Sequence, residues 1–404
     1  MNIEQIRKDF PTLERKVNNK DLIYLDTAAT SQTPKVVIDA INNYYNHQNS
    51  NVHRGVHTMS QEATESFELV RDKLKNFIGA KEREEIIFTK GTTESINLLA
   101  YSFSEAYIRE GDEIIISELE HHSNIVPWQI IAERKKAKLR IIPYSDEKGL
   151  DIEKFSQMLN PNTKIVSVSH VSNALGVVNP IEKIIEIAHT HNVPVHIDGA
   201  QGAPHFKLNM QELDCDFYSF SAHKLYGPMG AGILYGKRKY LEAMPPFHGG
   251  GEMIKEVSFS GTTYNEIPFK FEAGTPSVAD IIGFGAAIDY IQSIGLEKIQ
   301  VYEHKIMQYA IEKLSSIEDL FIYGNQLEKS GSLSFNIDGI HSFDLGTLLD
   351  QLGIAVRTGH HCAQPIMQHY YISGTIRASF GIYTTLDEID TLYSSIIRLK
   401  SMLK

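Results

Sequence analysis

The sequence predicts an α/β fold: a mainly parallel seven-stranded sheet flanked by helices, with a smaller α+β domain beside it. Three observations lead to this prediction. Seven short apolar segments are spread over residues 84–236, and helical patterns lie between them. The 404-residue chain is 42% hydrophobic and 22% charged, which is an ordinary globular composition with ample material for a large core.

The predicted strands are nearly continuous apolar runs and lack the in–out alternation of half-exposed strands. Such runs are typical of strands that are buried on both faces of a parallel sheet. Helical patterns such as 93–111 and 181–192 separate them, which gives the βαβ order of an α/β domain. The seven runs are 84–89, 112–117, 139–144, 164–171, 193–198, 217–222 and 231–236.

The C-terminal part of the chain has a different pattern. Helical patterns near 278–316 and 386–403 flank strand-like segments at 332–337 and 353–358. We therefore expect a large domain over residues 21–290. A small α+β domain is expected to combine residues 1–20 with residues 291–404.

Charge and composition exclude several classes of protein. The net charge of −11 and the pI of about 5.9 do not favour binding to nucleic acid or to an anionic membrane. The sequence starts with charged and polar residues, unlike a signal peptide, and no apolar run reaches the length of a membrane span. A cytoplasmic location is therefore expected.

The chain has two cysteines, which excludes a disulfide framework and a CxxC metal site. No metal is expected. Cys215 lies in the apolar context LDCDFYSF and is interpreted as a core residue. Cys362 lies among polar residues in RTGHHCAQP, where a thiol is expected to be exposed and reactive.

Lys224 follows an apolar strand in FSAHKLYGPMGAGIL and precedes a glycine-rich turn. Most lysines at such positions are solvated loop residues. At the end of a buried strand, however, a lysine can lose its proton and form an imine. The glycines that follow allow the backbone to approach a ligand closely.

Asp198 ends another buried strand, in VPVHIDGAQ, where ligands bind in open α/β sheets. It could be a helix N-cap, or its carboxylate could pair with a protonated pyridine nitrogen of a cofactor. Asp198 and Lys224 would then hold opposite ends of one cofactor from neighbouring strands. Gln201 could bond to the ring hydroxyl of that cofactor.

Gly91, Thr92 and Thr93 lie between a strand and a helix, in IIFTKGTTESINLLA. Free N–H groups at a helix start bind phosphate, although the same residues also suit an ordinary capping box. Ser221 and His223 could complete the phosphate site.

The pair His121–His122, in SELEHHSNIVPWQ, offers an aromatic ring to stack on a pyridine and a group that can move protons. From the residues alone, either histidine fits this role, and a surface pair fits equally well.

These motifs resemble a known family. The segments HIDGAQ, SAHKLYGP, FEAGTP and RTGHHCAQP, in this order, resemble the SufS-type (group II) cysteine desulfurases and selenocysteine lyases, which are fold-type I pyridoxal-phosphate enzymes. The resemblance extends from LDTAATSQTP at 25–34 to IRASFGIY at 376–383 and therefore covers essentially the whole chain.

The resemblance implies a role for each matching residue. Lys224 would carry pyridoxal 5′-phosphate as a Schiff base, Cys362 would accept sulfur, and His121 would stack on the ring and act as an acid or base. Asp198 and Gln201 would bind the pyridine nitrogen and the ring hydroxyl. The implied phosphate contacts are Thr92, Thr93, Ser221, His223 and, from the other subunit of a homodimer, Thr275. The implied contacts to the substrate carboxylate are Asn173, Arg377 and the neighbouring Arg357.

The family converts L-cysteine to L-alanine and holds the sulfur as a persulfide that feeds iron–sulfur cluster assembly. Selenocysteine lyase activity is also expected. The sulfur acceptor is either a SufE-type or a zinc-containing SufU-type protein. Phe343 stands where SufU-type pairing would need a histidine, and His341 lies two residues earlier, which favours a SufE-type acceptor.

Other functions share part of this pattern. Another fold-type I aminotransferase or lyase would need Lys224 and Asp198 but no thiol at Cys362. A non-catalytic scaffold for sulfur transfer would not need the complete set of lysine, aspartate, thiol and arginine. A globular protein without a site would not carry four such motifs in this order.

Overall fold

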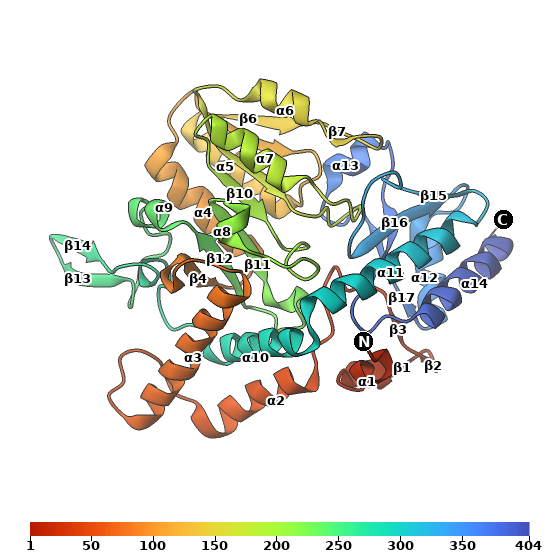
Figure 1. The fold of residues 1–404 in the computed structure, drawn as a ribbon, viewed down its shortest axis with the longest axis horizontal. Helices are drawn as coiled ribbons and strands as arrows, with labels where there is room; N and C mark the ends of the chain where they lie inside the picture. The colour runs from red at the N-terminus through yellow and green to blue at the C-terminus, as the bar shows by residue number, and fades with distance from the viewer. Residues whose placement is uncertain (404) are drawn as a thin grey trace.

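The computed structural model describes residues 1–403 and contains the predicted sheet of seven strands (Figure 1). In spatial order the strands are β4 (Ile86–Thr89), β12 (Gly232–Gly236), β11 (Phe217–Ser221), β10 (Val195–Asp198), β9 (Thr163–Ser169), β5 (Glu113–Ser117) and β6 (Lys138–Ile142). The pairs from β11 to β6 are parallel, whereas β12 is antiparallel to both of its neighbours. Residues 84 and 85, which were expected to belong to the first strand, instead form part of the 3₁₀ helix η3 (Arg83–Glu85).

The strands of this sheet are buried on both faces, which explains their continuous apolar sequences. Ile114 and Ile116 of β5 belong to one core, whereas Ile115 belongs to the core on the opposite face. The helices of the first core are α4 (Thr92–Tyr107), α5 (Val126–Lys135) and α9 (Arg238–Ala243). Those of the second include α3 (Thr58–Phe77), α6 (Ile152–Met158), α7 (Ile181–Thr190), α8 (Met210–Leu213) and α10 (Val278–Ile294).

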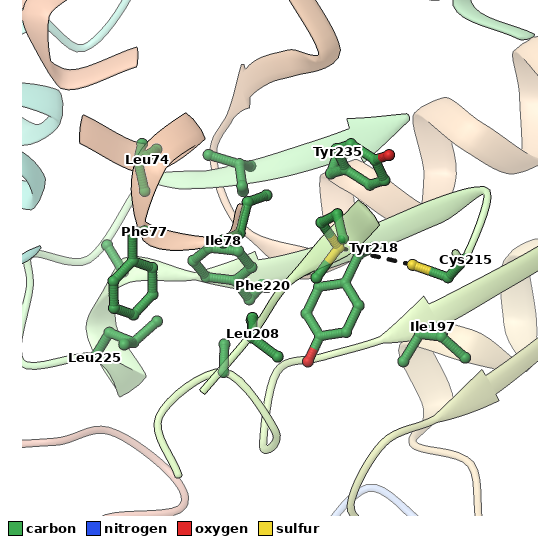
Figure 2. Close-up of a cluster of buried hydrophobic side chains, with 14 of the residues drawn as sticks. Leu74, Phe77, Ile78, Ile197, Leu208, Cys215, Tyr218, Phe220, Leu225 and Tyr235 are labelled. Atoms are coloured by element: carbon green, nitrogen blue, oxygen red, sulfur yellow. Dashed lines mark hydrogen bonds between the residues drawn. The ribbon is translucent and has the colours of Figure 1, made fainter. Parts of the chain in front are cut away.

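Cys215 belongs to the second core, as its apolar context predicts. The residue is fully buried, and its thiol contacts the sulfur of Met210 at 3.7 Å. Figure 2 shows this thiol among the aromatic and aliphatic side chains around Tyr218 and Ile197. Burial raises the pKa of the Cys215 thiol well above its ordinary value, so the group is a packing residue and not a nucleophile.

A second sheet of four antiparallel strands occupies the other end of the molecule (Figure 1). Its strands, in spatial order, are β15 (Leu320–Ile322), β16 (Ser332–Ile337), β19 (Thr375–Ser379) and β18 (Arg357–Gly359). A third core joins this sheet to α11 (Leu296–Ser315), α12 (Ser342–Gln351) and α14 (Leu386–Leu403). The division of the chain at residues 20 and 290 stays a prediction.

The predicted strand 353–358 is split between two sheets. Its first part, β17 (Ile354–Ala355), pairs with β3 (Ile23–Tyr24), and its second part is β18 of the small sheet. This split brings the segment around Asp26 beside the small sheet, where Asp26 forms a bridge with Ser379. The N-terminal segment therefore lies next to the C-terminal strands.

The remaining elements connect or flank these two sheets. Those near the N-terminus are α1 (Ile3–Arg7), η1 (Pro11–Glu14), β1 (Lys16–Val17), β2 (Lys20–Asp21), α2 (Lys35–Asn43) and η2 (Tyr44–Gln48). Later ones are η4 (His122–Asn124), β7 (Tyr144–Ser145), β8 (Gly149–Leu150), η5 (Ala222–Lys224), β13 (Ile254–Ser258), β14 (Gly261–Tyr264), η6 (Phe269–Phe271) and α13 (Gln364–His369). Among residues 1–403, no helix has both the length and the apolar character needed to cross a membrane.

Candidate active site

One cavity of about 220 Å³ gathers almost all of the residues that the sequence singles out. It lies where β9, β10 and β11 end, with the small sheet on its other side. This is the edge at which parallel α/β sheets bind ligands. The predicted residues that line it are Thr92, Thr93, His121, Asn173, Asp198, Gln201, Ser221, His223, Lys224, Arg357, Cys362 and Arg377.

Lys224 and Asp198 follow neighbouring parallel strands, as the sequence predicts, and both line the cavity. Burial lowers the pKa of Lys224 to about 8, with Asp198 opposing this shift and Arg377 and Arg357 adding to it. The amine is therefore poised to lose its proton near neutral pH. Burial also raises the pKa of Asp198, although the N–H of Ala200 at 2.9 Å and the charge of Lys224 both stabilise the carboxylate.

The start of α4 faces the cavity and is not capped by its own N-cap residue. Gly91 precedes the helix with a φ of 143°, a conformation that favours glycine, and it has no side chain to cap the first turn. The alternative of an ordinary capping box is therefore not realised. The Oγ of Ser221 accepts the N–H of Thr92 at 2.8 Å and lies 2.7 Å from its Oγ1. Two hydroxyls and a helix N-terminus thus converge on one point, which suits a phosphate group.

Three further predicted cofactor contacts line the same cavity. The hydroxyl of Thr93 lies 2.8 Å from that of Ser123, and both groups line the cavity. His223 has a buried Nδ1 without a hydrogen-bond partner within the described chain. Gln201 is buried, and its amide donates to the carbonyl of Ala28 at 2.7 Å, which fixes the side chain at the cavity wall. The unpartnered His223 nitrogen indicates a position for a ligand atom.

The structure separates the two adjacent histidines. His121 lines the cavity, whereas His122 does not, which resolves the ambiguity that the sequence leaves. The Nδ1 of His121 accepts the N–H of Ser123 at 3.0 Å. Burial, followed by the charges of Lys224 and the neighbouring histidine, lowers the pKa of His121 to about 3. This ring is therefore neutral at physiological pH, and its Nε2 carries the proton.

The small sheet contributes a cationic wall to the cavity. Arg357 and Arg377 lie opposite each other on β18 and β19, and Asp26 lies 3.3 Å from both guanidinium groups. Arg377 is buried, donates to the main-chain carbonyl of Asn173 at 2.7 Å, and has an Nε without a partner. The side-chain Oδ1 of Asn173 is also buried and unpartnered. Unsatisfied donors and acceptors of this kind suit the carboxylate and amine of an amino acid.

Cys362 brings a half-buried thiol to the same cavity. It lies between β18 and α13, and both His361 and Cys362 have φ values above 50°. Two consecutive non-glycine residues in this left-handed region are unusual and require support from their surroundings. A nucleophile, an amine, a carboxylate and two guanidinium groups therefore share one small space.

Three further residues at this site could not be assigned a role from the sequence. Asp26 lies within the recognised segment LDTAATSQTP, yet only the fold shows that it contacts the two arginines. His361 is buried in the cavity wall and bonds to the hydroxyl of Thr375 at 2.8 Å. Glu120 is fully buried directly before the histidine pair, and burial raises its pKa to about 7. In the sequence, the position of Glu120 directly before His121 was the only feature that could have singled it out.

Thr275 is the one predicted site residue that lies elsewhere within the chain. It lines a separate cavity together with His53, Lys90 and His248. Its contribution to the site of a second subunit stays a prediction.

Comparisons with known proteins show the family of this chain. The family model described as Aminotransferase class-V matches residues 23–392. A probable cysteine desulfurase of Halalkalibacterium halodurans is 49% identical over 400 residues, covering 99% of this chain and 98% of that protein.

Two solved structures share the fold over nearly their full lengths. The crystal structure of the Escherichia coli cysteine desulfurase CsdA (S-sulfonic acid) superposes with a TM-score of 0.93 and 37% identity, covering 100% of both chains. The apo structure of a cysteine desulfurase from Thermococcus onnurineus NA1 gives 0.93 and 41%, covering 98% of this chain and 97% of that one.

Proposed function

Since the chain belongs to the aminotransferase class-V family, we propose that it is a SufS-type cysteine desulfurase that moves the sulfur of L-cysteine onto Cys362 and releases L-alanine. One observation carries this proposal: the Cys362 thiol lines the same cavity as Lys224, Asp198 and Arg377. An aminotransferase would need the lysine, the aspartate and the arginine, but it would have no use for a thiol at this place.

The residues of the cavity fit pyridoxal phosphate, the cofactor of this family. The N-terminus of α4 and the hydroxyls of Thr92 and Ser221 suit the phosphate. His223 offers a buried nitrogen without a partner, Asp198 a buried carboxylate, and Lys224 a buried amine of lowered pKa. When bound, the cofactor supplies an electron-accepting ring that stabilises negative charge at the substrate Cα.

Each protein group then has a defined task. Arg377 binds the carboxylate of L-cysteine through its guanidinium, whose Nε is free of other partners. Lys224 removes the proton from the substrate Cα, which its lowered pKa allows near neutral pH. The carboxylate of Asp198, stabilised by the N–H of Ala200 and the charge of Lys224, would pair with the pyridine nitrogen of the cofactor. His121, which is neutral, exchanges a proton at Nε2 with the thiol groups.

Cys362 completes the reaction as a nucleophile. Its thiolate forms a bond to the substrate sulfur as the Cβ–S bond breaks, and the electron pair of that bond remains with the carbon unit. Protonation of this unit gives L-alanine, and Cys362 is left as a persulfide. The atoms of one cysteine and one thiol account for both products, so no external oxidant or reductant is needed.

The proposal extends to a second substrate and to partners. L-selenocysteine would bind through the same amine and carboxylate, and its weaker C–Se bond reduces the need for Cys362. A homodimer would bring Thr275 of the second subunit to the phosphate. The persulfide would pass to a SufE-type acceptor and on to iron–sulfur cluster assembly.

The start of α12 supports this choice of acceptor. His341 is the N-cap of α12, and its Nδ1 accepts the N–H of Phe343 at 3.3 Å. His341 and Phe343 are both exposed there, and Phe343, which stands at the position expected for the zinc-binding histidine, cannot bind zinc. Persulfide transfer to SufE-type and SufU-type proteins, measured side by side, tests the choice. Transfer to the SufU-type protein alone would reverse it.

Two variants test the desulfurase itself. Cys362→Ala should keep the visible absorption of the bound cofactor and lose alanine formation from L-cysteine. Lys224→Ala should lose both the ordinary absorption spectrum and the activity. Cys215→Ala is the matched control, because Cys215 is buried away from the cavity. Full activity of Cys362→Ala with L-cysteine would disprove the persulfide role, and formation of a keto acid would identify an aminotransferase.

A further inference from the structure

The polar main-chain atoms next to Cys362 are bonded almost completely. The carbonyl of His361 accepts the side-chain amide of Asn173 at 2.6 Å. The N–H of Cys362 donates to Nδ1 of His360 at 3.1 Å. The N–H of Ala363 donates to the carbonyl of His360 at 2.8 Å. The thiol therefore sits on a segment whose shape is fixed by hydrogen bonds from several directions.

His122, the second histidine of the pair, provides two more of these bonds. Its main-chain N–H donates to the carbonyl of Cys362 at 2.7 Å. Its ring Nε2 accepts the N–H of Gln364 at 3.1 Å. One residue of η4 thus binds the thiol loop at two points, at Cys362 itself and two residues further along the chain. The mechanism above gives this histidine no task, because it does not line the cavity.

We propose that His122 is a positioning residue that holds the loop 360–364 in the conformation in which the Cys362 thiol faces the cavity. His361 and Cys362 both have left-handed φ values, which non-glycine residues rarely adopt without external bonds. The ring of His122 supplies such a bond at the point where the loop enters α13.

The C-terminal end of α13 is also held by hydrogen bonds, in this case to the segment around β7. Tyr370, just after the helix, bonds to Asp146 and lies 3.4 Å from the hydroxyl of Tyr144. Figure 1 shows α13, coloured blue, beside the yellow strand β7 of the large domain. His122 and Tyr370 therefore anchor the two ends of one short element, and the thiol loop lies at the His122 end.

The ring of His122 can accept a hydrogen bond only while Nε2 is unprotonated. Partial burial, and then the proximity of His360, lower the pKa of His122 below its ordinary value. The two ring centroids are 5.6 Å apart, so a charge on one ring disfavours a charge on the other. Both nitrogens that hold the loop are thus acceptors in the neutral state of the rings.

Alkylation of Cys362 by iodoacetamide, followed by peptide mass spectrometry on the cofactor-loaded protein without substrate, tests the proposal. His122→Phe keeps a ring of similar size but removes the hydrogen-bond acceptor. The rate of Cys362 alkylation in this variant should differ from that of the wild-type protein by about fivefold, as expected for one lost hydrogen bond. His122→Gln places an oxygen near the former Nε2 and should restore the rate to within about twofold. The buried Cys215 is an internal reference for folding, and His191→Gln, at an exposed position, is the matched control.

The labelling experiment tests the positioning role of His122 separately from the proposed desulfurase function. Only the expected effect on kcat rests on that function. An unchanged alkylation rate in His122→Phe, with Cys215 still protected, would overturn the positioning role. A glutamine variant no better than the phenylalanine variant would also overturn it. With L-cysteine, His122→Phe should lower kcat about fivefold or more and leave KM within about twofold, since Arg377 is untouched. Absence of alanine from the wild-type protein would reject the desulfurase function but leave the labelling result valid.

Discussion

The hydroxyl of Ser221 at the end of β11 lies 2.7 Å from the hydroxyl of Thr92 at the start of α4. The same Ser221 oxygen accepts the main-chain N–H of Thr92 at 2.8 Å. A strand from the middle of the sheet and the helix that follows its edge strand β4 are thereby joined at the proposed phosphate position. This contact fixes the positions of the two hydroxyls that would bind the phosphate.

Ser221→Ala should weaken the binding of pyridoxal phosphate. The variant loses a hydroxyl at the phosphate and leaves the N–H of Thr92 without its acceptor. A hydrogen bond to a charged group is worth about 1.5–3 kcal/mol, so the Kd should rise about 10- to 100-fold. Titration of the apo-protein with the cofactor measures the change. Ser258→Ala, on the exposed hairpin, is the control, and equal affinities of the two variants would argue against a phosphate role for Ser221.

Gly232→Ala should destabilise the protein by about 1–3 kcal/mol, the usual cost of overpacking. A Cβ on Gly232 would lie 2.5 Å from the Cα of Gly91 and 2.7 Å from the carbonyl of Phe220. Both neighbours are main chain and cannot move aside cheaply. Urea unfolding measures the loss, with Gly249→Ala as a control, since nothing lies within 4 Å of a Cβ there. Equal stability of the two variants would contradict the close packing at Gly91.

Uptake of pyridoxal phosphate by the apo-protein should depend on pH through Lys224. The neutral amine is the reactive form, and its pKa is lowered to about 8. Below this pH, the neutral fraction rises about tenfold per unit, and above it the fraction levels off. Rapid-mixing measurements between pH 6 and pH 10 should show this rise and plateau. A rate that still climbs tenfold per unit at pH 9 would place the pKa of Lys224 at its ordinary value.

Lys329 should make the protein more stable as the pH rises. This buried residue donates to the carbonyls of Leu175 at 2.7 Å and Tyr323 at 2.6 Å, and burial lowers its pKa to about 7. A lysine in the unfolded chain has a pKa of about 10.4. Between these values the unfolded chain binds one more proton than the folded chain, so the free energy of unfolding increases with pH.

The size of this effect follows from comparison with a variant that cannot titrate at residue 329. Urea unfolding of the wild-type protein and of Lys329→Met at pH 7, 8 and 9 isolates the contribution of the lysine. The difference in the free energy of unfolding should shift in favour of the wild type by about 1 kcal/mol per pH unit. A difference that stays constant over this range would show that the amine is protonated in the folded state.

The strands of the large sheet could be predicted because burial on both faces leaves a plain sequence signal. The positions of Asp198 and Lys224 then followed, since Asp198 ends one of those strands and Lys224 lies just beyond the next. The direction of β12 could not be predicted, because an apolar run has the same composition whichever way it points. Its antiparallel pairing with β11 is visible only in the register.

The parts of the site that depend on contacts between distant segments were also beyond the sequence. Asp26 meets Arg377 across 351 residues, and no local pattern indicates that pairing. The left-handed backbone at His361 and Cys362 could not be predicted either, because neither histidine nor cysteine is typical of a positive φ. The resemblance to a known family indicated Cys362, whereas the hydrogen bonds that hold its loop join segments that lie far apart in the sequence.

The pairing of β3 with β17 and the contact of Asp26 with Arg377 have a consequence for biosynthesis. Ribosomes add about 5–20 residues per second, so the N-terminal segment waits tens of seconds for its partners to be made. Until Arg357 and then Arg377 have left the ribosome, Asp26 lacks its two guanidinium partners and the cationic wall of the cavity is incomplete. A nascent chain can therefore assemble the large sheet first, and the cationic wall of the cavity is completed only as translation finishes.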